Sequence, residues 1–220
     1  MSTGTDPSTT ARPETPAEAW HELRRGNARF VSGEPRHPRQ DVERRTEVAS
    51  GQAPLAALLG CSDSRLAAEI IFDQGLGDLF VVRNAGQVAS ESAIGSLDYA
   101  VGALGVPLIV VLAHDNCGAV RAAIDAHRPD AAPLSPHIRS LIDHITPAVQ
   151  RVIGTDGTVD AAEIEPADVG QEHLRDTVTE ILEASEMISA AIAEGKLAIV
   201  GANYRLSEGR AETDVVVGAV

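Results

Sequence analysis

Three short runs of apolar residues, which alternate with helix-like segments, constrain the fold of this chain more than any other feature. The runs are Leu55 to Leu59, Leu79 to Val82 and Leu108 to Ala113. A short, almost wholly apolar run is typical of a strand that is buried on both faces of a sheet. Strands that alternate with helices form parallel sheets, because the helix returns the chain to the starting edge. The sequence therefore predicts an α/β fold with a central, mostly parallel sheet flanked by helices.

The N-terminal part of the chain predicts a helical arm. The tetrapeptide Thr-Pro-Ala-Glu at 15–18 is a capping box with proline at the first helical position, so a helix should begin there. Trp20, Leu23 and Phe30 then form a narrow apolar stripe, which could face the chain's own core or a partner subunit. Residues 1–15 are rich in Ser, Thr and Pro and are interpreted as a disordered N-terminal segment.

The rest of the chain is expected to form one domain, residues 16–220, since neither an internal repeat nor a second domain boundary is evident. Residues 32–51 are polar and are interpreted as a connecting arm. Further elements are expected at the C-terminal end: a long helix from about Gln171 to Glu194 and a hairpin of Leu197 to Leu206 with Arg210 to Val217.

Charge and composition disfavour several classes of partner. The formal net charge is −14 at pH 7, which argues against nucleic acid or an anionic membrane surface as a partner. The sequence has no run of about 18 apolar residues that could span a bilayer. The N-terminal residues also lack the pattern of a signal peptide, so a cytoplasmic protein is expected.

Two short motifs contain the residues that could bind a metal or take part in catalysis. Each motif directly follows an apolar run. Cys61-Ser-Asp-Ser-Arg65 follows the first run, and His114-Asp-Asn-Cys117 follows the third. Both motifs should meet at the carboxyl edge of the sheet. Two thiolates and one imidazole are the protein ligands of a catalytic zinc site with one open position. One Zn²⁺ per chain, bound by Cys61, His114 and Cys117, is therefore predicted; the alternative, a disulfide, is disfavoured by a reducing compartment.

Asp63 and Arg65 lie two and four residues beyond the first cysteine and can reach the metal or each other. An Asp–Arg pair can hold the carboxylate off the zinc, where it can accept a hydrogen bond from bound hydroxide. Unpaired, the same carboxylate could become the fourth ligand and close the site. The amides that begin at Gly118 are expected to favour a bound anion at a helix N-terminus. This combination suits the hydration of a small electrophile that yields an anion.

With two further motifs, these residues resemble the β-class carbonic anhydrases. The further motifs are Phe-Val-Val-Arg-Asn-Ala-Gly at 80–86 and Ser-Leu-Asp-Tyr-Ala-Val at 96–101. The resemblance runs from about Trp20 to Leu206. It implies a zinc lyase that reversibly hydrates CO₂ to bicarbonate and a proton by attack of zinc-bound hydroxide, with Asp63 and Arg65 as the catalytic dyad.

The resemblance also implies substrate-binding residues and a partner. Gln52 matches a glutamine whose amide donates to bound bicarbonate. Phe80, Ala85 and Tyr99 match residues that wall the pocket for CO₂, although the family more often has Val where this chain has Ala85. In the family this pocket lies at a dimer interface, with the N-terminal helix packed on the partner subunit. A homodimer, or a homotetramer built from dimers, is therefore implied.

An inhibitory bicarbonate site of part of the family is incomplete in this sequence. Arg83 and Tyr204 match two of its residues, but Leu58 stands where that site has a tryptophan. We therefore expect an enzyme of the non-cooperative kind. The histidines outside the motifs have no ligand-like spacing and are interpreted as surface or cap residues: His21, His37, His127, His137, His144 and His173.

Two other functions remain open from the sequence. One keeps the fold and the zinc but changes the substrate to another small heteroallene, such as carbon disulfide. The other is a zinc-dependent sensor or scaffold, in which Asp63 is the permanent fourth ligand and the site is closed. The second alternative predicts zinc content without hydration activity.

Overall fold

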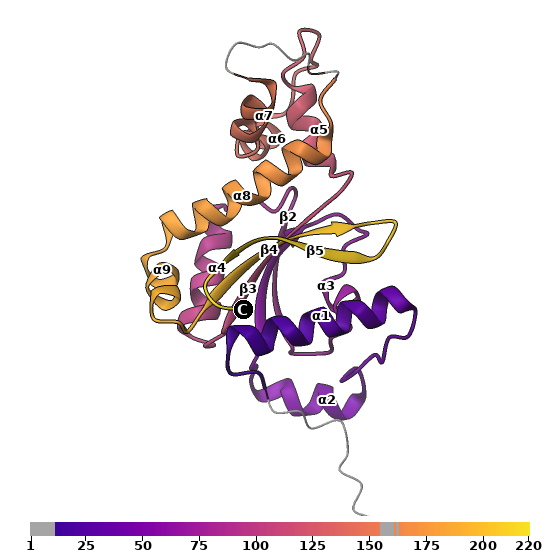
Figure 1. Cartoon of the computed structure of the whole chain (residues 1–220), viewed down its shortest axis with the longest axis vertical. Helices are drawn as coiled ribbons and strands as arrows, with labels where there is room; N and C mark the ends of the chain where they lie inside the picture. The colour runs from indigo at the N-terminus through magenta and orange to yellow at the C-terminus, as the bar shows by residue number, and fades with distance from the viewer. Residues whose placement is uncertain (1–11, 155–160, 162) are drawn as a thin grey trace, which may run out of the picture.

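The computed structural model describes residues 12–154, 161 and 163–220. Within these residues the chain forms a five-stranded sheet with the order β2-β1-β3-β4-β5 (Figure 1). The strands are β1 (Ala56–Cys61), β2 (Leu79–Asn84), β3 (Leu108–His114), β4 (Ala198–Arg205) and β5 (Arg210–Val217). Strands β1 to β4 are parallel, and β5 pairs antiparallel with β4 as the expected hairpin. The prediction of a mostly parallel central sheet is confirmed.

Helices cover both faces of this sheet (Figure 1). They are α1 (Pro16–Ser32), α2 (Val42–Glu47), α3 (Ala68–Ile71), α4 (Glu91–Gly102), α5 (Gly118–Asp125), α6 (Pro136–Ile142), α7 (Thr146–Ile153), α8 (Pro166–Ala184) and α9 (Glu186–Ala193). Helices α4, α8 and α9 lie on one face of the sheet, and α1 and α3 lie on the other. Helices α5, α6 and α7 pack together and against α8, beyond the sheet (Figure 1). None of the helices in the described residues combines the length and apolarity needed to cross a membrane.

Strand β3 shows why the apolar runs predicted a sheet buried on both faces. All seven of its residues are buried. Leu108, Val110 and Leu112 belong to the core on the α1 side, whereas Ile109 and Val111 belong to the core on the α4 side. Side chains alternate between the faces of a strand, so a strand with helices on both sides needs apolar residues at every position.

Helix α1 begins where the capping box predicts. The Thr15 hydroxyl accepts a hydrogen bond from the Glu18 backbone N–H at 3.2 Å, and the Glu18 carboxylate accepts from the Thr15 N–H at 3.2 Å. The apolar stripe of α1 serves the chain's own core, because Trp20 and Leu23 are buried in it. Packing of this helix on a partner stays a prediction, since the structure describes one chain. Residues 1–11, most of the segment expected to be disordered, lie outside the described residues.

The connecting arm contains structure that the sequence analysis missed. Residues 42–47 form the short helix α2, which continues into a 3₁₀ turn at Val48–Ser50. Asp41 caps α2, since its carboxylate accepts from the Arg44 N–H at 2.7 Å. A polar helix of six residues has no periodic apolar pattern, so composition alone predicted a loop.

The long C-terminal helix expected over Gln171 to Glu194 is two helices. Helix α8 begins earlier, at Pro166, and ends at Ala184. Ser185 has an extended backbone with φ of −121° and ψ of 104°, and its hydroxyl caps α9 by accepting from the Ile188 N–H at 3.1 Å. A serine within an apolar periodic pattern does not by itself predict a break between helices, because serine occurs in helix interiors as well as at caps.

Truncation of Leu23 tests the packing of α1 in the chain's own core. The Leu23 side chain is fully buried, so Leu23→Ala should lower the free energy of unfolding by about 2–5 kcal/mol through the cavity that it leaves. Urea denaturation followed by circular dichroism measures this. Val31→Ala on the same helix is the control, because Val31 is 38% exposed. A Leu23→Ala midpoint equal to that of the control would contradict the packing described here.

Candidate metal centre

The three predicted zinc ligands come together at the carboxyl edge of the sheet. Cys61 ends β1, His114 ends β3, and Cys117 directly precedes α5. Strands β1 and β3 are parallel neighbours, so their last residues lie side by side. One ligand atom from each residue lies within 4.8 Å of the others, and all three residues are buried. The sequence prediction of this convergence is confirmed.

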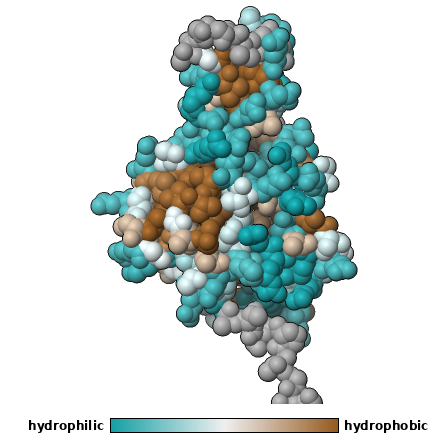
Figure 2. Space-filling view, viewed as in Figure 1, coloured by the Kyte–Doolittle hydropathy of each residue, from teal (hydrophilic) through white to brown (hydrophobic). Residues whose placement is uncertain are grey.

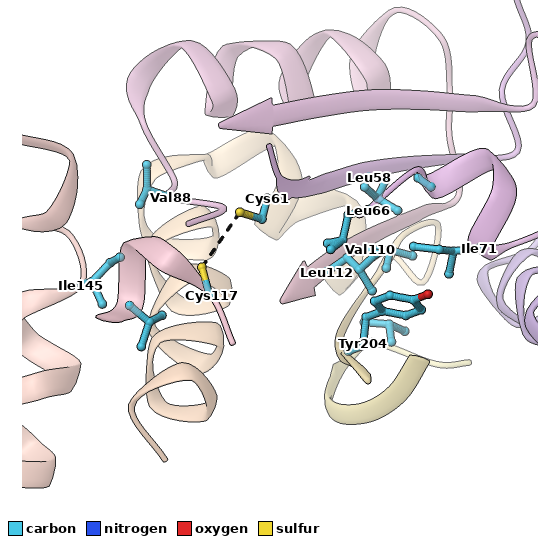
Figure 3. Close-up of a cluster of buried hydrophobic side chains, with 14 of the residues drawn as sticks. Leu58, Cys61, Leu66, Ile71, Val88, Val110, Leu112, Cys117, Ile145 and Tyr204 are labelled. Atoms are coloured by element: carbon cyan, nitrogen blue, oxygen red, sulfur yellow. Dashed lines mark hydrogen bonds between the residues drawn. The ribbon is translucent and has the colours of Figure 1, made fainter. Parts of the chain in front are cut away.

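The two cysteine sulfurs are spaced for a shared ion rather than for a disulfide. Their separation is 4.0 Å, and they are directed at each other (Figure 3). A disulfide would need about 2.05 Å, and both cysteines are free. Two sulfurs bound tetrahedrally to zinc at about 2.3 Å each lie about 3.8 Å apart. The observed spacing fits that arrangement.

His114 presents a bare nitrogen to the same point. Its Nδ1 lies 2.7 Å from the Asp115 carbonyl oxygen, which only accepts, so Nδ1 carries the hydrogen. Nε2 is then an acceptor; it is buried and has no hydrogen-bond partner among the described residues. A buried acceptor without a donor is costly, whereas a metal ion would satisfy it. A histidine that binds a metal through one ring nitrogen often donates from the other to a backbone carbonyl, which fixes the orientation of the ring.

The electrostatics of the thiol pair also favour a cation. The hydrogen bond from the Cys117 thiol lowers the pKa of Cys61 to about 4. The same hydrogen bond, together with burial, raises the pKa of Cys117. These opposite directions favour a thiolate in the pair, which a cation bound between the sulfurs would stabilise. The amides of Ala119 and Val120, at the start of α5, favour the ionised form of Cys117.

The first amides of α5 were predicted to favour a substrate anion. Those of Ala119 and Val120 also oppose the rise in the pKa of the Cys117 thiol. The space beside Gly118 is open, because a Cβ at this position would meet no atom within 4 Å. The role of Gly118 in binding substrate stays a prediction.

Asp63 and Arg65 form the predicted pair. One carboxylate oxygen of Asp63 accepts from the Arg65 backbone N–H at 2.9 Å and from Nε at 2.8 Å, and the other accepts from Nη2 at 2.7 Å. The hydrogen bonds from the Arg65 side chain hold the pKa of Asp63 well below its usual range. Arg65 also donates to the Asn116 carbonyl at 3.3 Å, which joins the two motifs. The carboxylate is thus ionised and engaged by arginine.

Arg83 has a contact that sequence reasoning did not find. Its Nε donates to the Cys61 carbonyl at 3.0 Å, and its Nη2 donates to the Asp63 carbonyl at 2.7 Å. It therefore fixes the backbone between the first ligand and the dyad. Tyr204 was matched with Arg83 to an inhibitory site, and Leu58 stands where that site has a tryptophan. Both are buried in one apolar cluster (Figure 3). The sequence analysis placed Arg83 directly after the predicted strand, whereas the structure includes it in β2.

The predicted substrate residues are partly assembled within one chain. The rings of Phe80, on β2, and Tyr99, on α4, have centroids 6.1 Å apart. Ala85 is exposed in the turn that follows β2. Gln52 is exposed before the amino end of β1, at the sheet edge opposite Cys61. The structure therefore does not bring Gln52 to the metal centre of its own chain.

A model of the family described as carbonic anhydrase matches residues 56–211, which contain all three candidate ligands and the dyad. The chain belongs to the carbonic anhydrase family. Carbonic anhydrase 2 of Mycobacterium tuberculosis is 49% identical to it over 197 residues, which cover 89% of this chain and 91% of that protein. Zinc-dependent hydration of CO₂ is the reaction of this family, so the chain is an enzyme with zinc as its cofactor.

Experimental structures place this carbonic anhydrase in the β class. The Coccomyxa β-carbonic anhydrase, in complex with acetazolamide, superposes with a TM-score of 0.64 and 26% identity, over 79% of this chain and 78% of that one. A tetrameric β-carbonic anhydrase from Sordaria macrospora shares the fold, with a TM-score of 0.67 and 23% identity over 88% and 95% of the two chains. The fold and family expected from the sequence are confirmed.

Proposed function

We propose that this carbonic anhydrase hydrates CO₂ at the centre formed by Cys61, His114 and Cys117. The observation that supports this assignment best is the buried Nε2 of His114, which lacks a hydrogen-bond partner among the described residues and lies within 4.8 Å of the ligand atoms of both cysteines. A zinc ion held there supplies Lewis acidity and a nucleophile near neutral pH.

In this proposal Asp63 orients the attacking group, and Arg65 keeps Asp63 available for that purpose. Arg65 engages both carboxylate oxygens, so the carboxylate stays an ionised acceptor instead of moving onto the metal. The oxygen that accepts only from Arg65 Nη2 has further acceptor capacity, and it can receive a hydrogen bond from the attacking group. Arg83 holds the intervening backbone in place, which limits the motion of Asp63 towards the ligands.

We assign binding of the apolar substrate to Phe80, Ala85 and Tyr99. CO₂ has no net charge or dipole, so a small apolar wall retains it without competing with product for polar groups. Bicarbonate, in contrast, is an anion with three oxygens. We propose that it uses the open space beside Gly118 and a donor amide from Gln52.

Gln52 can serve only if another subunit supplies it, so we propose a homodimer or a tetramer of dimers. The position of Gln52 at the opposite sheet edge supports this. Large apolar side chains are also exposed, among them Tyr99 at 53%, Met187 at 49% and Val216 at 41%. Figure 2 shows a continuous apolar area beside α9, of the kind that marks protein interfaces. The related Sordaria macrospora proteins are described as tetrameric. We propose a cytoplasmic location, where reducing conditions would keep both cysteines free to bind a metal.

Substitution of Gln52 tests this arrangement. Gln52→Ala should keep its zinc and lose activity on the order of 100-fold, since one donor to the developing anion is removed. Stopped-flow CO₂ hydration measures the loss, and Gln150→Ala, at another exposed glutamine, is the control. Full activity of Gln52→Ala would exclude a role in catalysis.

Complementation then tells whether Gln52 acts across subunits. Gln52→Ala and Cys61→Ser chains are unfolded together and refolded as mixed oligomers. If Gln52 serves the partner, a mixed dimer contains one centre with both zinc and glutamine, and activity returns. If mixing restores nothing while size-exclusion chromatography shows mixed oligomers, the proposal of action across subunits is wrong.

A further inference from the structure

His173 lies in the protein interior, although its spacing in the sequence predicted a surface or cap histidine. Its side chain, on α8, is 1% exposed, and its Nε2 lies 2.7 Å from the Gly86 carbonyl oxygen. The carbonyl only accepts, so Nε2 carries the hydrogen and Nδ1 does not. Nδ1 is buried without a hydrogen-bond partner among the described residues, and burial lowers the pKa of the imidazole. His173 is therefore a neutral donor to one backbone carbonyl.

Gly86 connects this histidine to the metal centre. Its φ is 81°, in the left-handed region that favours glycine. A Cβ at this position would lie 3.0 Å from the Cβ of Ala119 and 3.1 Å from the Cδ1 of Ile145, so the residue occupies a tight space beside α5. Its carbonyl accepts from His173, and its N–H donates to the Cys61 sulfur at 3.3 Å. One residue thus joins the buried histidine to a ligand sulfur.

Packing alone does not account for a histidine at this position. An apolar side chain of similar size would fill the interior without leaving Nδ1 unsatisfied, which carries a free-energy cost. Within the described residues, the His173 ring makes one hydrogen bond, to the Gly86 carbonyl. This bond is therefore the contact that can offset the cost. The hydrogen bond from His173 holds the Gly86 peptide, and the N–H of Gly86 donates to the Cys61 sulfur.

We propose that His173 is a positioning residue for the metal centre, which holds the Gly86 peptide so that its N–H donates to the Cys61 sulfur. A hydrogen bond to a ligand thiolate stabilises its negative charge in the low-dielectric interior and fixes the direction of its lone pairs. Residues that orient ligands in this way affect metal affinity without touching the metal. The inference rests on the proposed role of Cys61 as a metal ligand.

Zinc affinity of two variants at position 173 tests this inference. His173→Leu removes the donor, whereas His173→Gln can place its Nε2–H near the Gly86 carbonyl. The control is Thr177→Val, one turn along α8, where a buried hydroxyl donates to the His173 carbonyl at 2.9 Å. Competition with a chromophoric chelator should show zinc binding weakened about 10-fold or more in His173→Leu. It should remain near wild type in His173→Gln and Thr177→Val. Wild-type affinity in His173→Leu would overturn the inference.

Nuclear magnetic resonance of cadmium-substituted protein separates this inference from the ligand assignment on which it rests. With an NMR-active cadmium isotope, scalar coupling should appear between the metal and the Cys61 β-protons, and also between the metal and the Gly86 amide proton. The Gly86 coupling should disappear in His173→Leu and persist in His173→Gln. Coupling to Cys61 without coupling to Gly86 in the wild-type protein would overturn the inference even if no variant folds. Absence of the Cys61 coupling would instead reject Cys61 as a ligand.

Discussion

Replacement of Cys61 by serine is expected to remove zinc and CO₂ hydration together. A serine hydroxyl does not ionise near neutral pH, so the centre loses one of its two anionic donors and keeps His114 and Cys117 alone. Three protein ligands are the set that a catalytic zinc site uses, and the metal is the source of the nucleophile. We expect activity to fall at least about 1,000-fold in Cys61→Ser, with far less than one zinc bound per chain.

Metal analysis and stopped-flow hydration on the same sample measure both effects. Ser62→Ala is the matched control, because Ser62 is exposed beside Cys61 and its backbone N–H, which the change preserves, donates to the Asn84 carbonyl at 2.9 Å. The control should retain zinc and activity. Stoichiometric zinc in Cys61→Ser would remove Cys61 from the ligand set, and activity without zinc would reject metal-dependent catalysis in this protein.

Asp63→Ala is expected to separate metal binding from catalysis. The Asp63 carboxylate is bound by Arg65 and is not among the grouped ligand atoms, so its removal should leave zinc in place. It should lower the hydration rate on the order of 100-fold or more, since a positioned acceptor of the attacking group is lost. The fold should survive, because Arg65 is half exposed and exposed ion pairs contribute little to stability.

The comparison variant for this prediction is Glu69→Ala, which removes an exposed carboxylate on α3. It should hydrate CO₂ at the wild-type rate. Loss of zinc from Asp63→Ala would make Asp63 a ligand and favour a closed site. Near-wild-type turnover of zinc-loaded Asp63→Ala would show that the Asp63–Arg65 pair is structural.

The sequence predicted the parts of this structure that local pattern determines. Strand β3 carries apolar side chains at every position before its terminal histidine, and such a strand has few places other than the middle of a sheet covered by helices. Parallel topology then brings Cys61 and His114 to one edge, whatever their separation in sequence. The candidate ligand set followed from residue chemistry, since the chain has two cysteines and each lies in one of the two motifs.

The parts that the sequence did not predict depend on contacts between distant segments. His173 meets Gly86 across 87 positions of sequence, and Arg83 reaches back 22 positions to the Cys61 carbonyl. Neither contact has a spacing rule, because one depends on how α8 packs on the sheet and the other on how β2 pairs with β1. The break at Ser185 was missed for a local reason: serine fits both a helix interior and a cap, and tertiary packing decides between them.

The central claim, that this chain hydrates CO₂ at a Cys–His–Cys zinc centre, is tested most directly by stopped-flow CO₂ hydration with metal content assayed on the same sample. We predict that activity is proportional to bound zinc, reaches its maximum at about one zinc per chain, and disappears and returns as zinc is removed by chelation and restored. Full zinc occupancy with no hydration at pH 7 or pH 8.5 would contradict the claim and would favour a closed site or another small heteroallene as substrate.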